Sequence, residues 1–515
     1  MTSPEPDSIP QPLIKYIQNF KQTFNQDAEN SENSSESLTK TLTSQKRDLH
    51  NSKFRSIFWR FYLSCFSNKR SNWANECDIY RSIYKDLKAK FLPIKDEYLV
   101  NNVKQDVRRT MPDKKIFREE KIQEMMTDIL LLWSIASPCG KRLSYRQGVH
   151  EILAPMIFVL KQDHATYSCM KELYAKSNVS NSDDSNLTWP SDIDILLDPK
   201  HIEADSFLML CRLMFFVEPW YGTNQLFKQL QNQTADHNYQ QESENELENS
   251  TVPNSIAALL DGRMSRSEEE FSKEHIDVKL ERIHNSTLRI LDFELYQHLK
   301  VNDIIPQVYG IRWLRLLFGR EFNHEDSLAV WDFIFSFFPQ SGPSSNNSNS
   351  KDSNSTSSQI STESSKNQTN NYNNHYYTIS NITDMVFCSM LTKIRHKLLS
   401  GGEQVCVQYL MKYPKITDIS LILDQTTKYL EIYPNLYLRE KETFGQKALM
   451  DSLSNLSIAK GKTLNSMLGS GNKNVSQIIS RPTIFGGFGE FRLYFFLSSF
   501  VFLYKSLLYF PARQR

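Results

Sequence analysis

Two polar side chains, Arg109 and Gln147, stand near the ends of predicted helices, where they could contact another molecule. A guanidinium is a planar, permanently charged donor that suits phosphoryl oxygens, and a carboxamide both donates and accepts hydrogen bonds. Taken separately, each has a simpler explanation: Arg109 as half of an exposed ion pair with Asp106, and Gln147 as a polar helix start. The two become informative together only if one surface carries both.

The stretch 100–112, VNNVKQDVRRTMP, predicts a helix that ends close to Arg109. Its three valines fall within a narrow arc of a helical wheel, and Arg109 falls on the opposite, solvent-facing side. Pro112 disfavours helical backbone at the residue before it, so the helix should end within a residue or two of Arg109. Asp106, one turn earlier, is within reach of the arginine and can pair with it.

The stretch 144–151, SYRQGVHE, leads into the apolar run 152–160, ILAPMIFVL, which predicts a buried helix. The residues just before such a helix lie near the surface, so Gln147 should be exposed. Gly148 leaves no side chain beside it, and glycine at the start of an element indicates an unusual backbone angle or a close approach by another segment.

The composition of the chain narrows its class. The 515 residues carry 60 Lys and Arg against 59 Asp and Glu, so the net charge of +1 gives no general attraction to nucleic acid. The seven cysteines are scattered and show no C-x-x-C spacing, which disfavours a disulfide framework and a zinc site. The N-terminus lacks a basic segment followed by an apolar one, so we expect no secretory signal and a cytoplasmic protein.

Segments with apolar residues at helical spacing alternate along the chain with segments of polar composition. Residues 1–50 are expected to form a disordered N-terminal tail, because polar residues dominate them. Residues 51–440 carry aromatic and aliphatic residues at helical spacing without a credible series of strands, which predicts an all-α domain. Residues 441–490 are polar again and are expected to be a flexible linker. Low-complexity inserts, interpreted as expanded surface loops, interrupt the helical domain near 177–186, 229–255 and 341–374.

Residues 491–515 form a hydrophobic C-terminal segment that contains the eighteen-residue run LYFFLSSFVFLYKSLLYF. This length is near the lower limit for a membrane span, and Lys505 could reach the lipid–water interface from it. Three interpretations stay open. They are a membrane anchor with membrane contact through 491–510, a hydrophobic helix docked on the core, and translated non-coding sequence from a faulty gene model.

Several short motifs follow one another in a fixed order along the helical domain. VKQDVRRT resembles an I-x-x-D-x-x-R motif, YRQG a Y-x-Q-G motif, and FRSIFW (54–59) an R-x-x-x-W opening. EADSF (203–207) and LRLLFGREF followed by LAVWD (328–332) resemble a middle and a late signature. Together, over about residues 54 to 438 less the inserts, they resemble the TBC-domain family of GTPase-activating proteins for Rab GTPases. Within that family they are most similar to the member-five type, which acts on endosomal and autophagic membranes.

The resemblance implies a multi-helix TBC-type fold whose partner is a Rab-family small GTPase in the GTP state. This family supplies an arginine finger and a glutamine finger in trans, and the matching positions here are Arg109 and Gln147. Asp106, Tyr145 and Gly148 would support the geometry of the fingers. No cofactor is expected, because magnesium and GTP are carried by the GTPase, so the chain would be a GTPase activator and no enzyme in its own right.

The sequence also departs from the member-five type. In that type a longer insert, which is used to engage retromer, lies between the counterpart of residues 91–99 and the helix that carries the arginine. This chain has almost no residues at that place. Retromer binding is therefore doubtful for this chain. The leading expectation is a Rab activator in vesicle traffic, peripheral on endosomal or autophagic membranes. The alternative is a membrane-associated Rab-binding scaffold or adaptor without activating capacity. The sequence specifies neither the Rab nor the oligomeric state, since specificity lies in the surface around the fingers.

Overall fold

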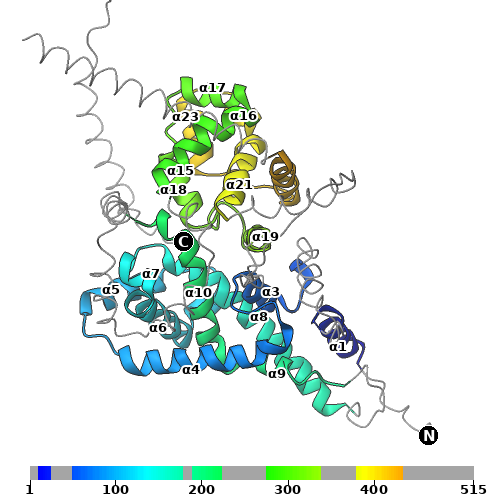
Figure 1. The fold of residues 1–515 in the computed structure, drawn as a ribbon. Helices are drawn as coiled ribbons and strands as arrows, with labels where there is room; N and C mark the ends of the chain where they lie inside the picture. Colours follow the sequence, from blue (N-terminus) through cyan, green and yellow to red (C-terminus); the bar gives the residue numbers. More distant parts are fainter. Residues whose placement is uncertain (1–9, 25–48, 178–187, 223–273, 338–378, 433–515) are drawn as a thin grey trace, which may run out of the picture. The chain divides into compact units, whose positions relative to one another are not determined.

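The computed structural model describes residues 10–24, 49–177, 188–222, 274–337 and 379–432. Over these ranges the chain is helical, with turns between the helices and no strand, which confirms the all-α fold class (Figure 1). The chain divides into the units Met1–Glu442 and Thr443–Arg515, and every described residue belongs to the first.

Several parts of the predicted organisation lie outside the described residues. They are nearly all of the three polar inserts, the linker 441–490 and the hydrophobic segment 491–515. Among the helices that are described, none combines the length and the apolar character that a membrane crossing requires.

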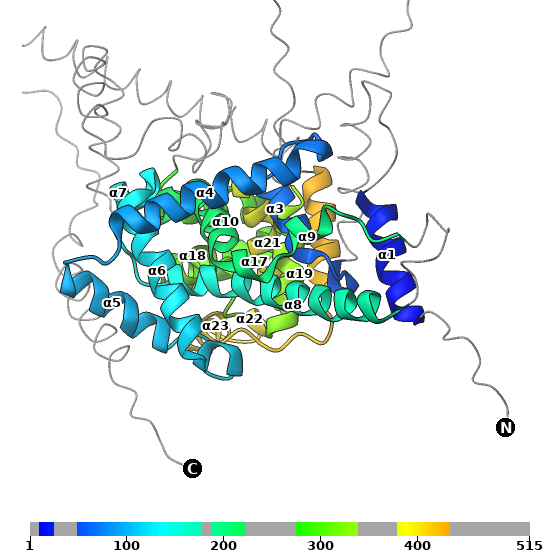
Figure 2. The same cartoon turned by 90° about the horizontal axis from the view of Figure 1, so that it is seen from below.

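The first group of helices carries the two predicted finger residues, which are exposed next to helix ends. The long helix α8 packs against α3 and α10, while α6 packs against α4, α5, α7 and α10. Figure 2 shows α4 running along one side of this group and α5 beside α6. The helices are α3 (Arg55–Tyr62), α4 (Trp73–Phe91), α5 (Glu97–Arg108), α6 (Glu120–Ala136), α7 (Pro138–Leu143), α8 (Val149–Lys176), α9 (Ile193–Leu196) and α10 (Ile202–Val217).

The second group of helices follows in the chain and shares one hydrophobic core with the first. Helix α18 packs against α15 and α23, and α19 contacts both α21 and α3, so α19 connects the two groups. A π-helical turn over Ile283–Leu288 continues α15 into α16. The helices are α15 (Ile276–Arg282), α16 (Arg289–Leu291), α17 (Phe293–Val301), α18 (Gln307–Arg315), α19 (His324–Phe335), α21 (Ile379–Lys393), α22 (Arg395–Leu398), α23 (Glu403–Met411) and a last helix over 420–432.

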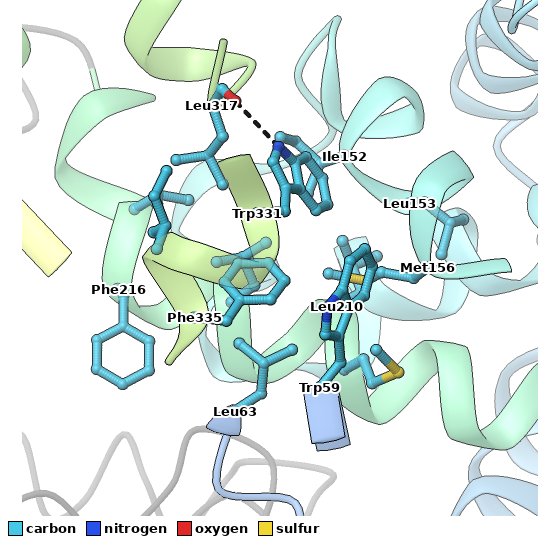
Figure 3. Packing of buried hydrophobic residues seen from close by; sticks show 14 of the residues in the cluster. Trp59, Leu63, Ile152, Leu153, Met156, Leu210, Phe216, Leu317, Trp331 and Phe335 are labelled. Atoms are coloured by element: carbon cyan, nitrogen blue, oxygen red, sulfur yellow. Dashed lines mark hydrogen bonds between the residues drawn. The ribbon is translucent and has the colours of Figure 1, made fainter. Parts of the chain in front are cut away.

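Tryptophans from the first and late motifs meet in the core between α3 and α19 (Figure 3). The ring of Trp59 lies 5.8 Å from that of Trp331 and 5.2 Å from that of Phe335, centroid to centroid. The indole N–H of Trp331 donates to the Leu317 carbonyl at 2.9 Å, so the polar end of this buried ring is satisfied. The two motifs therefore pack against each other across a long stretch of sequence.

Two buried carboxylates tie charged motif residues into this core. Asp332 accepts the indole N–H of Trp59 at 2.7 Å and lies 3.1 Å from a guanidinium nitrogen of Arg55. Asp205, in the middle motif, is fully buried and lies 3.0 Å from Arg60 and 2.9 Å from Arg81. A buried carboxylate is costly unless it is paired in this way, so these motif residues act as braces of the fold.

Helix α1 (Gln11–Phe24) corrects the prediction that residues 1–50 are a disordered tail. Its apolar side chains recur at helical spacing and are buried; they are Leu13, Tyr16, Ile17, Phe20 and Phe24. The ring of Phe20 lies 5.4 Å from that of Phe54, and the ring of Tyr16 lies 4.9 Å from it. Short helices owe most of their stability to tertiary packing, and the polar composition of the first fifty residues does not reveal that this apolar face packs on the domain.

We predict that Phe20→Ala lowers the free energy of unfolding by about 3–5 kcal/mol, because it empties a buried aromatic site. Urea denaturation followed by tryptophan fluorescence measures the change. Gln18→Ala, an exposed position on the same helix, is the matched control and should have little effect. Equal stability of the two variants would show that α1 does not pack on the domain.

Candidate functional site

Arg109 is the residue at which α5 ends, as its sequence predicts. Asp96 caps the start of the helix by accepting the backbone N–H of Leu99 at 3.0 Å, while Val103 and Val107 are buried. Arg109 is the C-cap, and 56% of its side chain is exposed. A long cationic side chain at this position extends from the surface while its backbone stays fixed by the helix.

The carboxylate of Asp106 holds Arg109 and Tyr145 together. Only 6% of this side chain is exposed. One oxygen, Oδ1, accepts an N–H from the guanidinium of Arg109, and the other, Oδ2, accepts the hydroxyl of Tyr145 at 2.9 Å. Tyr145 lies 39 residues away in the sequence, so this carboxylate joins the loop after α5 to the loop before α8.

Burial keeps two further neighbours of Asp106, Tyr145 and His150, uncharged. Burial, followed by the negative charge of Asp106, raises the pKa of Tyr145 well above its ordinary value, so this phenol stays a neutral donor. His150 lies on the same carboxylate, with Nδ1 3.4 Å from the Tyr145 oxygen and 3.5 Å from Asp106 Oδ2. Burial lowers the pKa of His150, against the opposing effect of the Glu151 and Asp106 carboxylates, which favours the neutral imidazole.

Gln147 lies in the turn that precedes α8, and its side chain is exposed. No hydrogen bond of its amide group forms within the described part of the chain, so the amide is available to another molecule. Gly148 is the N-cap of α8 and has φ +104° and ψ −22°. A Cβ atom there would also lie 3.3 Å from Cδ2 of Leu316, so both predicted reasons for a glycine apply.

The late motif places a second arginine near the start of α8. Arg320 donates through Nε and Nη2 to the two carboxylate oxygens of Glu151, at 2.7 and 2.6 Å. This bidentate pair fixes the loop between α18 and α19 against the first turn of α8. Our sequence analysis missed Arg320 and His150 as parts of the site. The only sequence signals were that Arg320 lies inside the late motif and that His150 follows the YRQG motif, because both act through contacts between distant segments.

The guanidinium of Arg109 and the amide of Gln147 are thus exposed at the end of α5 and in the turn before α8. The buried carboxylate of Asp106 joins these two segments. Arg109 offers a charged, planar fork, and Gln147 offers a donor and an acceptor. Asp106, Tyr145 and Gly148 fix the backbone and side chains from which these two project. Such a surface can stabilise negative charge on a partner and orient a polar group beside it.

The sequence model of the Rab-GTPase-TBC domain matches residues 52–189 and 254–344 of the chain. Together with the helical fold and the order of the motifs, this match identifies a Rab-GTPase-TBC domain in this part of the chain. The individual relatives then indicate which branch of the family this chain resembles.

The curated relatives include TBC1 domain family member 5 of Mus musculus, 29% identical over 404 residues that cover 73% of this chain and 40% of the relative. The Homo sapiens protein of the same name is 28% identical, with 73% and 41% covered. Member 5 homolog B of Dictyostelium discoideum is 26% identical over 471 residues, with 75% and 40% covered. The similarity to the member-five type is confirmed, and the chain spans about 40% of the length of these relatives.

A solved structure shares the fold. The crystal structure of the Ypt/Rab-GAP domain of Gyp1p matches with a TM-score of 0.51 and 15% sequence identity. The match covers 82% of this chain and 99% of that one, so the two chains have the same helical architecture over most of their lengths.

We predict that Gly148→Ala lowers the free energy of unfolding by about 1–2 kcal/mol, because an L-residue is strained at this positive φ. The added methyl group would also press on Leu316. Gly222→Ala is the control, since a Cβ there meets its nearest neighbour at an ordinary 3.8 Å. If urea denaturation gives the two variants the same stability, the backbone at Gly148 is not the constraint described.

Proposed function

We propose that this chain activates a Rab-family GTPase by supplying Arg109 and Gln147 to the GTP-binding site of that partner. The observation that carries the proposal is the Asp106 carboxylate, which binds the exposed arginine and the tyrosine two residues before the exposed glutamine. The match to the Rab-GTPase-TBC domain supports a Rab as the partner.

Arg109 would act on the charge of the transition state. Hydrolysis by a small GTPase is slow because the charge that spreads over the transferred phosphoryl oxygens is incompletely neutralised. A guanidinium from a second protein offers those oxygens a fixed positive charge and two parallel N–H groups. Asp106 restricts the rotamers of Arg109 before the partner arrives, which reduces the entropy lost on insertion.

Gln147 would act on the attacking water. Its amide can accept a hydrogen bond from the water and donate one to a backbone carbonyl, which fixes the direction of attack. The turn at Gly148, whose positive φ a glycine adopts without strain, holds this amide at the start of α8, while the helix itself is anchored in the core. No cofactor of the chain is needed for either role, because GTP and magnesium come with the partner.

The cellular setting is part of the proposal. Similarity to proteins named TBC1 domain family member 5 supports vesicle traffic on endosomal or autophagic membranes, with a peripheral cytoplasmic location. A short turn between Phe91 and Glu97 joins α4 to α5, so the chain lacks an insert there, which argues against retromer as a partner by that route. A scaffold that binds a Rab without accelerating it is the alternative that the following two measurements distinguish.

We predict that Arg109→Lys reduces the acceleration of GTP hydrolysis by about 10³–10⁵-fold, since lysine keeps the charge but loses the planar fork. Single-turnover hydrolysis measures this on the member of a Rab panel that the wild-type chain accelerates most. Arg108→Lys is the matched control, because Arg108 is the exposed residue next to it. A scaffold would bind a Rab yet accelerate none of the panel, and full activity of Arg109→Lys would contradict the assigned role.

We predict that Gln147→Ala slows the same reaction by about 10²–10³-fold, the typical effect of removing one preorganised polar group from a transition state. Rab binding should change little, because the amide contributes mainly once the water is in place. Gln162→Ala, an exposed glutamine on α8 itself, is the control. A loss of Rab affinity with an unchanged rate in the bound complex would assign Gln147 to binding and remove it from the mechanism.

A further inference from the structure

A cleft of about 740 Å³ lies beside the arginine-bearing helix. It is lined by parts of α4, α5, α6 and α10 and by the turn at 92–94. Its apolar wall comes from Ala89, Leu92, Ile94, Val100 and Leu131. Its volume lies within the range of about 300–1,000 Å³ that is usual for ligand-binding clefts.

The rim of this cleft is basic. Lys85, Lys104 and Lys200 line it, are exposed, and form no ion pair with any other residue in the described ranges. A fourth lysine, Lys88, is already neutralised by the cleft's two carboxylates, Asp128 and Glu203. The lysines of the lining thus outnumber its carboxylates four to two around an apolar wall, although the whole chain has a net charge of only +1. Charge of one sign around a low-dielectric hollow attracts a ligand of the opposite sign.

We propose that this cleft is a docking site for an acidic peptide segment of a partner protein, with apolar side chains against the wall and carboxylates beside the three lysines. The mixed lining requires both properties in one ligand. A purely ionic ligand would leave the wall of Leu92, Ile94 and Leu131 without a contact, and a purely apolar one would leave the lysines unused.

The shape of the site favours a peptide over a membrane surface. A bilayer binds to basic and apolar groups that project from a protein, because its headgroups form an extended layer. Here the apolar groups line a concavity, and Leu131 is only 4% exposed. A peptide can insert single side chains between helices, which is a recurring mode of recognition.

The proposed site is separate from the finger residues but shares a helix with them. Val100 and Lys104 lie on α5, whose C-cap is Arg109. A ligand in the cleft would therefore contact the helix that carries Arg109. It would do so at Val100 and Lys104, which take no part in positioning the Arg109 side chain. The proposal does not depend on the proposed function, because peptide binding is measured with no GTPase present.

The test is fluorescence anisotropy on the full chain with a short fluorescein-labelled peptide that alternates glutamate pairs with single leucines. We expect saturable binding that Lys85→Glu combined with Lys200→Glu weakens at least about tenfold, because both lysines would then repel the ligand. The matched control combines Lys415→Glu with Lys428→Glu, which makes the same charge change at exposed positions away from the cleft. That control should bind like the wild type.

Further variants test the shape of the site. Ala89→Trp fills the cleft from an exposed helical position without altering charge, and it should also abolish binding while circular dichroism stays unchanged. Peptides with lysine for glutamate, or with alanine for leucine, should bind at least about tenfold more weakly than the parent peptide.

Three results would overturn the proposal. They are absence of saturable binding, equal binding by the cleft and control double variants, and binding of anionic vesicles in place of the peptide through the same lysines. Peptide binding that appears only after deletion of residues 229–255 would also overturn it, since the chain's own insert would then be the occupant.

Discussion

A carboxylate buried beneath the surface, that of Asp106, is the constraint on which the site depends. A charge with so little access to water must be compensated by the protein, and both of its oxygens are engaged by hydrogen-bond donors. One donor is the exposed guanidinium and the other is the phenol of Tyr145. Burial of this charge costs free energy, and the same removal of water strengthens the two hydrogen bonds that the carboxylate accepts. Two loops from distant parts of the chain are therefore fixed relative to each other.

The charged residues of the other motifs stabilise the helices around Asp106 without contacting it. Asp205 and Asp332 are buried carboxylates too, but their partners are arginines, a tyrosine and a tryptophan within the core. Arg320 binds Glu151 at the surface and so ties the loop after α18 to the first turn of α8. The charged motif residues are therefore of two kinds: buried ones that brace the helices, and ones near the surface that hold the candidate site together.

The sequence predicted the local features of the site well. Valine spacing and Pro112 located the end of α5 near Arg109, and Gly148 marked an unusual backbone angle at the start of α8. These features depend on neighbours along the chain. The role of His150 and the pair formed by Arg320 depend on contacts between distant segments, which periodicity does not encode.

Helix α1 was missed for a related reason. Its apolar face can be seen in the sequence. Whether such a face makes a short segment helical depends on the surface of the domain against which it packs. Phe54 and Trp73 provide that surface, and their positions follow from the packing of α3 and α4.

The position of α1 bears on where this protein can be cut for laboratory work. The family match begins at residue 52, yet the folded unit already includes Leu13 to Phe24, whose rings lie against Phe54, Phe58 and Trp73. A fragment trimmed to the matched boundary would expose several aromatic rings to water, and fragments of that kind tend to aggregate. Weak activity of such a fragment would then reflect loss of packing at this end of the domain, and it would not test the roles proposed for Arg109 and Gln147.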